Sequence, residues 1–374
     1  MSASTTACQE TSTSSQYRFV QLLQSAKKAR DENQNDKAIR LFRSALSERP
    51  ESQQALWYLG TMLYENGRYA EARDVLRQFM TIRPDAGPGW AFLGLSEFRL
   101  REYSHALNDL QRAIEQGLGD RGELAHAVRY DTAILLTRFE RYDDSMDIIL
   151  KMLASGQPDP SLVEPAGLAG LRLPLLPAEI PPERRKLIDL AGEAVLALQT
   201  QRYEDADTEF KKLIAAYPNE PGVHFLYGAY LAQLHPDEAI PEFERELKIS
   251  PYHVLARIRL ADIWITQGKF DRAMVLAKQA IKLDPNRASG HMLVGEALIG
   301  KGDTAAGIRQ LQIARTDDPT TIRIHWDLVR AYSAAGRKQD AEREQQEMEK
   351  LYHARSSHPR NQFGDAPQAE SAPK

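Results

Sequence analysis

Three of the nine histidines recur at one spacing and are the first candidates for metal chemistry. His224, His291 and His325 are separated by 67 and 34 residues, which places them at the same position of a repeated unit. Equivalent positions on neighbouring helical units lie roughly 8–10 Å apart or more. Zinc holds a nitrogen ligand at about 2.0–2.1 Å. These histidines therefore cannot share one ion, and we predict that they are packing residues with a polar edge.

The sequence contains no motif that would support catalysis or cofactor binding. It has no H-E-x-x-H, no G-x-S-x-G and no complete phosphate loop; Gly300-Lys301-Gly302 is predicted to be a turn. The single cysteine, Cys8, excludes an internal disulfide and a cysteine-based zinc site. Glu238, Glu242, Glu244 and Glu246 are interpreted as a surface charge run. We predict a protein that is not an enzyme, with no catalytic residue, no metal ion and no cofactor.

Composition restricts the class of protein further. Hydrophobic residues make up 42% of the 374 residues, which is enough for a packed core. The formal net charge of −4 lacks the basic excess of a nucleic-acid binder. No stretch approaches the roughly 20 apolar residues that span a bilayer. We expect a cytoplasmic protein by default, or a periplasmic or secreted one if the true start lies upstream.

The elements that must position these residues are repeats, because three kinds of residue recur every 33 or 34 positions. Alanines, small residues and prolines each form such a series, and the three series keep one phase. The alanine series is Ala38, Ala72 and Ala106, then Ala206, Ala239, Ala273 and Ala341; the small residues include Ala26, Gly60 and Gly94; the prolines are Pro50, Pro84, Pro218, Pro251, Pro285 and Pro319. Such a period predicts helix–turn–helix units that bury a core only by stacking.

This pattern resembles the tetratricopeptide repeat, whose signature is W-x2-L-G-x2-Y, A-x3-F and then P. Trp90-x2-Leu93-Gly94 matches its first part, and Ala38-x3-Phe42, Ala206-x3-Phe210 and Ala239-x3-Phe243 match its second. The resemblance covers residues 19–351 and implies an all-α, right-handed helical-hairpin solenoid of about nine repeats in two stacked arrays. The nine units start near Phe19, Gln53, Gly87, His126, Leu187, Pro221, Val254, Ala288 and Ile322.

The period breaks once, which divides the chain into five parts. We predict a disordered tail at 1–18, an array of four repeats at 19–154 with a degenerate fourth unit, and a proline-rich apolar insert at 155–183. An array of five repeats with a terminal cap follows at 184–352, and then a disordered tail at 353–374. The insert should contain a short helix near Ser161–Gly170. It either connects the arrays by packing or places Leu171–Pro177 in the groove as a built-in ligand.

In proteins of this family, helix A of each repeat lines the inner surface, mainly through its second, fifth, ninth and twelfth residues. The resemblance therefore implies a peptide-binding groove whose first half is aromatic and whose second half mixes apolar and charged residues. The alternative for any one aromatic residue is a place in the core between repeats. The candidate groove residues are Trp57, Tyr58, Thr61, Tyr64, Phe92, Phe98, Tyr130, Phe225, Ile258, Asp262, Met292, Trp326 and Arg330.

Two polar binding modes known in the family do not fit. Of the positions that would clamp a carboxylate, only Lys27 has a suitable charge, and no asparagine ladder is present. We therefore predict a scaffold that binds a protein or peptide segment through apolar and aromatic anchors. The alternative is an accessory or specificity subunit of an enzyme complex, such as envelope or polysaccharide assembly or a glycosyltransferase. Nucleic acid is not an expected partner, and no membrane span is expected.

Overall fold

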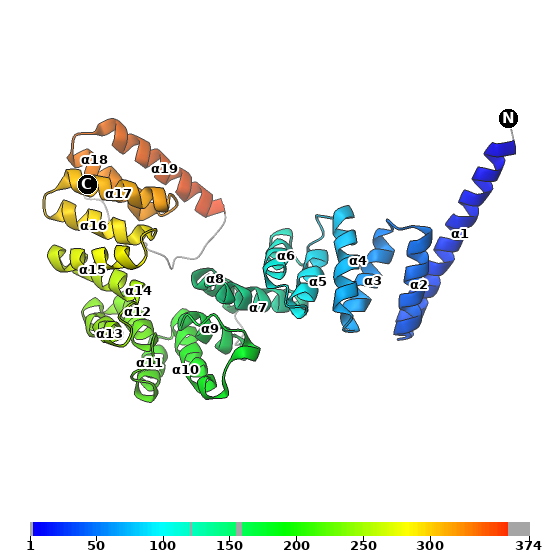
Figure 1. The fold of residues 1–374 in the computed structure, drawn as a ribbon, viewed down its shortest axis with the longest axis horizontal. Helices are drawn as coiled ribbons and strands as arrows, with labels where there is room; N and C mark the ends of the chain where they lie inside the picture. Colours follow the sequence, from blue (N-terminus) through cyan, green and yellow to red (C-terminus); the bar gives the residue numbers. More distant parts are fainter. Residues whose placement is uncertain (1–2, 120–121, 155–158, 358–374) are drawn as a thin grey trace. The chain divides into compact units, whose positions relative to one another are not determined.

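The computed structural model describes residues 3–119, 122–154 and 159–357 (Figure 1). The described residues form nineteen α-helices and two short 3-10 helices, with no strand among them. The chain divides into unit 1, which comprises Met1–Pro165 and Leu173–Ile180, and unit 2, which comprises Ala166–Arg172 and Pro181–Lys374. The prediction of an all-α helical-hairpin solenoid is confirmed.

Unit 1 contains four helical hairpins and two 3-10 helices. Its helices are α1 (Ala3–Asp31), α2 (Asn35–Glu48), α3 (Gln53–Glu65), α4 (Tyr69–Ile82), α5 (Gly87–Arg99), α6 (Tyr103–Gln116), α7 (Gly122–Arg138) and α8 (Tyr142–Leu153), with η1 (Pro160–Leu162) and η2 (Pro177–Glu179). Helix α9 (Val163–Gly170) falls where a short helix was predicted. Successive A helices contact each other as well as their own B helices, in the pairs α3 with α5 and α5 with α7.

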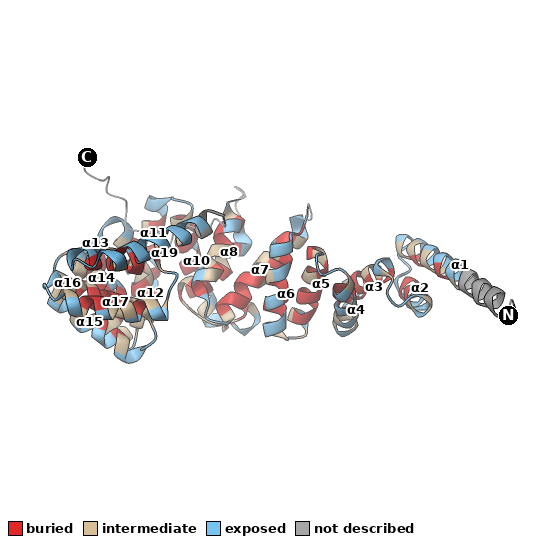
Figure 2. Cartoon of the chain, turned by 90° about the horizontal axis from the view of Figure 1, so that it is seen from above, coloured by how far each residue is buried: buried red, intermediate tan, exposed pale blue. Residues whose placement is uncertain are grey.

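Unit 2 contains five hairpins. Its helices are α10 (Pro182–Gln199), α11 (Tyr203–Ala216), α12 (Val223–Leu234), α13 (Pro236–Ile249), α14 (Val254–Thr266), α15 (Phe270–Leu283), α16 (Ala288–Gly300), α17 (Thr304–Asp317), α18 (Ile322–Ala334) and α19 (Lys338–Ser357). The A helices α12, α14, α16 and α18 contact one another in sequence. Figure 2 shows buried residues on the helix faces that meet neighbouring helices and exposed residues along the outer edges.

Close packing within a hairpin depends on the small residue of helix A. A Cβ atom at Gly60 would lie 2.7 Å from the side chain of Leu76 on α4. Leu76 is fully buried, and Ala72 beside it is as well. The two helices can therefore approach only because Gly60 has no side chain, which explains why small residues recur with the repeat period.

The fourth position of the repeat ties several repeats to the proline that ends the preceding one. The indole Nε1 of Trp90 donates to the carbonyl of Pro84 at 2.9 Å, and His224 Nε2 lies 2.9 Å from the carbonyl of Pro218. His325 Nε2 makes the same contact with Pro319, also at 2.9 Å. These side chains have different chemistry but share an N–H donor at one place. The two histidines are thus structural hydrogen-bonding groups.

The glutamate run on α13 is not uniformly on the surface, which corrects the sequence interpretation for Glu246. This carboxylate is buried, and it accepts hydrogen bonds from the backbone N–H of Gly222 at 2.9 Å and of Phe225 at 3.2 Å. It therefore satisfies free N–H groups in the first turn of α12. Four-residue spacing from Glu242, which lies 2.6 Å from His224, could have indicated this inward face.

The N-terminal segment differs from the predicted disordered tail at 1–18. Helix α1 begins at Ala3 and has 29 residues, so it extends past α2, which has 14 (Figure 1). The first 31 residues contain neither glycine nor proline, so nothing interrupts a helix that is anchored by the buried residues Phe19, Ala26 and Ala29. At the other end, α19 continues to Ser357, and residues 358–374 lie outside the described part of the chain.

Candidate partner-binding surfaces

Unit 1 carries a row of half-buried aromatic side chains on α3 and α5. The ring centroids of Trp57 and Phe92 are 5.7 Å apart, those of Tyr64 and Phe92 are 5.3 Å apart, and both pairs meet edge to face. Phe98, further along α5, is also half-buried, and its ring lies 5.8 Å from that of Tyr103. We call Trp57, Tyr64, Phe92 and Phe98 the aromatic stripe. The rings support one another while each keeps part of its surface exposed.

Polar groups border the aromatic stripe. Burial raises the pKa of the Tyr64 hydroxyl, and the nearby Arg99 guanidinium opposes that shift. Burial also raises the pKa of Asp131 to about 6, again against the attraction of Arg99. Tyr130 hydrogen-bonds to Glu164 of α9, and burial together with this carboxylate raises the Tyr130 pKa to about 12. The stripe therefore ends at a polar margin formed by α5 and α7.

Tyr58, another predicted groove residue, lies between the first two repeats. Its ring stacks on Phe42 at 5.6 Å, and the Arg30 guanidinium lies 4.4 Å from the ring centroid. Lys27, whose charge suited a carboxylate clamp, lies 5.5 Å from the same centroid. These cations engage the tyrosine face, which is a favourable cation–π arrangement.

Four predicted groove residues differ from the prediction because their side chains are buried. These residues are Thr61, Phe225, Ile258 and Met292. The Phe225 ring lies 6.0 Å from Phe243 and 4.5 Å from His253, so the fifth position of this repeat packs against its own hairpin and the start of the next repeat. The Thr61 hydroxyl donates to the carbonyl of Trp57 at 3.0 Å. Ile258 and Met292 belong to one core cluster of unit 2.

The remaining predicted residues in unit 2 lie at the edge of a buried ion network. Trp326 is 41% exposed, and the Arg330 guanidinium lies 4.4 Å from its ring centroid. Asp262 accepts a hydrogen bond from Arg323 at 2.6 Å. Sequence reasoning missed Arg323, because its partners lie 27 and 61 residues away and no local pattern reports such pairs.

Arg323 is surrounded by three carboxyl groups. Its Nε and Nη2 donate to Glu296 at 3.0 and 2.8 Å, in addition to the bond with Asp262. Asp327, one turn along α18, is buried, and its Oδ2 has no hydrogen-bond partner. Burial and the Glu296 carboxylate raise the pKa of Asp327 to about 9. The two carboxylates Glu296 and Asp262 raise the pKa of Arg323 above its usual range, against the effect of burial. We call Asp262, Glu296 and Asp327 the acidic seat.

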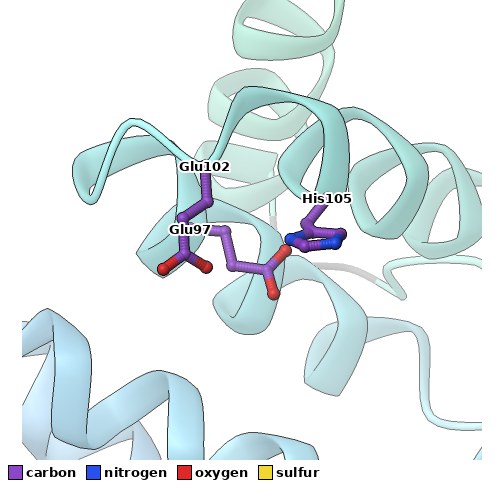
Figure 3. Close-up of side chains that lie close together, drawn as sticks. All are labelled: Glu97, Glu102 and His105. Carbon is purple, nitrogen blue, oxygen red and sulfur yellow. The ribbon is translucent and has the colours of Figure 1, made fainter.

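A second cluster of ligand-type side chains lies at the turn between α5 and α6 (Figure 3). Ligand atoms of Glu97, Glu102 and His105 all lie within 4.8 Å of one another. Arg77 Nη2 donates to Glu97 at 2.7 Å, and Arg73 forms an ion pair with Glu102. Because each carboxylate already faces a guanidinium, the cluster fits an ion-pair network between repeats better than a cation site. Sequence reasoning missed it, since its members lie on both sides of a turn.

The proline-rich insert contributes to both units rather than lying along one groove. The Arg138 guanidinium of α7 donates to the carbonyl of Pro174 at 2.7 Å and lies 3.6 Å from the carboxylate of Glu179. These residues belong to unit 1, whereas Leu171 belongs to unit 2. Leu171 and Leu176 are both buried. This division favours a connecting role for the segment Leu171–Pro177 over a built-in ligand.

Within the described part of the chain, no helix combines the length and the apolar character needed to cross a bilayer. Two family profiles, both described as tetratricopeptide repeat, match the chain: one at residues 23–87 and 93–160, the other at 230–297. The search of curated proteins returns no match.

Solved structures of MamA are similar to part of the chain. MamA from Desulfovibrio magneticus RS-1 has 22% identity and a TM-score of 0.41, and the match covers 46% of this chain and 97% of that one. MamA of AMB-1 has 19% identity and a TM-score of 0.38, over 44% and 98% of the two chains. A further MamA crystal structure has 16% identity and a TM-score of 0.39, over 44% and 97%.

Proposed function

The chain belongs to the tetratricopeptide repeat family of protein-interaction scaffolds, and we propose that it is a non-catalytic scaffold that binds a peptide or protein segment on the aromatic stripe of unit 1. The observation that carries this proposal is the row of edge-to-face rings that are packed on one side and exposed on the other. A surface of this kind is ordered before the partner arrives, so little conformational entropy is lost on binding.

The stripe supports recognition of apolar side chains. Aromatic residues at the centre of an interface supply most of its binding energy in many complexes. An amphipathic helix or an extended apolar segment would cover Trp57, Phe92 and Tyr64 while its polar side faces Arg99 and Asp131. We propose that unit 2 adds a second contact area at Trp326 and Arg330, and that the two units are two repeat arrays with separate cores.

The test is recovery of a partner by full-length chain variants used as bait. We expect Trp57→Ala and Tyr64→Ala each to reduce the amount of partner captured at least tenfold, measured by quantitative mass spectrometry. Circular dichroism should show nearly unchanged helicity, since each ring is only partly buried. The matched control is Tyr252→Ala, because Tyr252 is 80% exposed and lies outside the stripe.

The outcomes separate the alternatives. Loss of helicity in both stripe variants would assign the rings to the core. Equal capture by Tyr64→Ala, Trp57→Ala and the wild-type chain would contradict the proposal. Recovery of an enzyme through the stripe would make the chain an accessory subunit of that enzyme, which was the alternative prediction from the sequence.

A further inference from the structure

The acidic seat of unit 2 has more carboxyl groups than its own guanidinium engages. Arg323 uses two nitrogens on Glu296 and Asp262, and its side chain is only 17% exposed. Arg330, the other nearby cation, is exposed and lies over the Trp326 ring. Three carboxyl groups thus surround one buried guanidinium.

Asp327 supplies an independent sign that the network is incomplete. Asp327 is only 7% exposed, and its Oδ2 is buried without a hydrogen-bond donor. A buried carboxyl oxygen that lacks a partner raises the free energy of the folded state. In this chain that group faces Glu296, another carboxylate, which raises its pKa. The raised pKa shows that negative charge from the neighbouring carboxylate is not fully offset at this place, and a second cation between Asp262 and Glu296 would offset it.

The seat is accessible from one side and has apolar neighbours. The Asp262 side chain is 28% exposed, whereas that of Glu296 is 10% exposed, so Asp262 forms the open edge. Trp326, three residues after Arg323 on α18, presents an exposed ring. Ile265 and Ile299 are partly buried and pack against the hydrophobic core that α14, α16 and α18 share. A long aliphatic chain with a cationic end matches this combination, since its stem would cover apolar surface while its head reaches carboxylates.

We propose that the acidic seat binds a lysine side chain of a partner segment at the Trp326 and Arg330 contact area of unit 2, with its ammonium group between Asp262 and Glu296. Lysine fits better than arginine because Arg323 already makes the two-pronged contact with Glu296, and a compact ammonium can donate to separate acceptors. The inference rests on the proposed function, because it specifies the chemistry of the partner that binds the contact area of unit 2.

The test uses an array of 12-residue peptides and the full-length chain. Every peptide that contains one lysine is paired with the same sequence carrying norleucine, which keeps the aliphatic stem and removes the charge. We expect the wild-type chain to bind a subset of the lysine peptides at least tenfold more tightly than the matching norleucine peptides. Asp262→Asn should reduce that preference to less than twofold. The matched control is Asp271→Asn, which removes the same charge from an exposed side chain of α15 and should retain the preference.

The outcomes distinguish the inference from the function on which it rests. Equal binding of lysine and norleucine members by the wild-type chain overturns the seat and leaves the scaffold function standing, and this comparison needs no folded variant. A preference retained in helical Asp262→Asn also overturns it. If the wild-type chain binds no peptide, the proposed function fails and the seat fails with it.

Discussion

The two units join successive A helices through different chemistry. In unit 1, Trp57 and Phe92 form a contact of aromatic rings, whereas in unit 2 Asp262 and Glu296 hold Arg323. Both arrangements join successive repeats. The aromatic contact loses little when one ring is exposed, because each ring interacts through a large area. The ion network depends on every member, since removal of one charge leaves another buried without a partner.

This difference predicts that unit 2 is the more vulnerable to loss of a single side chain on its A helices. Arg323→Met should lower the free energy of unfolding of the repeats around α14, α16 and α18 by about 3–5 kcal/mol, because it leaves buried carboxylates unpaired. Hydrogen exchange measured by mass spectrometry would report this loss helix by helix.

Arg309→Met is the control for this comparison, because Arg309 lies exposed on α17 of the same unit. It should change the free energy of unfolding by less than about 0.5 kcal/mol. Unit 1 should keep its exchange pattern in both variants. Equal protection of α18 in Arg323→Met and wild type would show that the network contributes nothing to stability.

The repeat period can be predicted from the sequence, because close helix approach leaves no space for a side chain at Gly60 and buries Ala72 completely. The exposure of an individual side chain cannot be predicted from the sequence in the same way. Position five is half-buried at Trp57, buried at Met292 and exposed at Trp326. Its exposure depends on the side chains that neighbouring repeats supply.

Long-range polar pairs escape prediction for a related reason. The carboxylate of Glu246 caps α12 from 21 and 24 residues away, and Arg323 reaches Asp262 over 61 residues. Charged residues on a helix are usually solvated, so a charge run gives no local sign of burial. Only the stacking of helices brings such partners together.

A second prediction concerns pH and again distinguishes unit 2. His325 lies between Glu344, 2.8 Å from Nδ1, and the carbonyl of Pro319, so its charged form is favoured. The hydrogen bond to Glu344 is the main cause of its raised pKa. Because the folded state binds this proton more tightly than the unfolded state, the stabilisation is complete below about pH 6.5 and is lost as pH rises through the folded pKa.

Hydrogen exchange of α18 and α19 should therefore quicken between pH 5.5 and 8.5, after correction for intrinsic exchange rates. Asp327 adds a loss of the same sign, because its raised pKa also makes the folded state bind the extra proton. His325→Gln should weaken the pH dependence without abolishing it. An undiminished dependence in that variant would assign the whole effect to Asp327. We expect this change to be smaller than the effect of Arg323→Met.

The smallest predicted effect arises from the turns between helices A and B, where either a glycine or a residue with a side chain holds the left-handed position. The same left-handed turn position is held by Arg101 in unit 1, with φ of 63°, and by Gly302 in unit 2, with φ of 92°. A side chain in this conformation is disfavoured by roughly 1–2 kcal/mol. Glycine avoids this penalty, but its greater conformational entropy in the unfolded chain offsets part of the stabilisation. Arg101→Gly should therefore stabilise unit 1 by about 0.5–1 kcal/mol.

The reciprocal change tests the same cause in the other unit. Gly302→Arg should destabilise unit 2 by a similar amount, since space around Gly302 is open and only its backbone conformation opposes a side chain. Urea denaturation followed by exchange in each unit would measure both changes. If both substitutions altered stability in the same direction, backbone strain could not be the cause, and side-chain contacts at Arg101 would have to explain the difference. Opposite signs would show that the Arg101 turn of unit 1 tolerates strain that the Gly302 turn of unit 2 avoids.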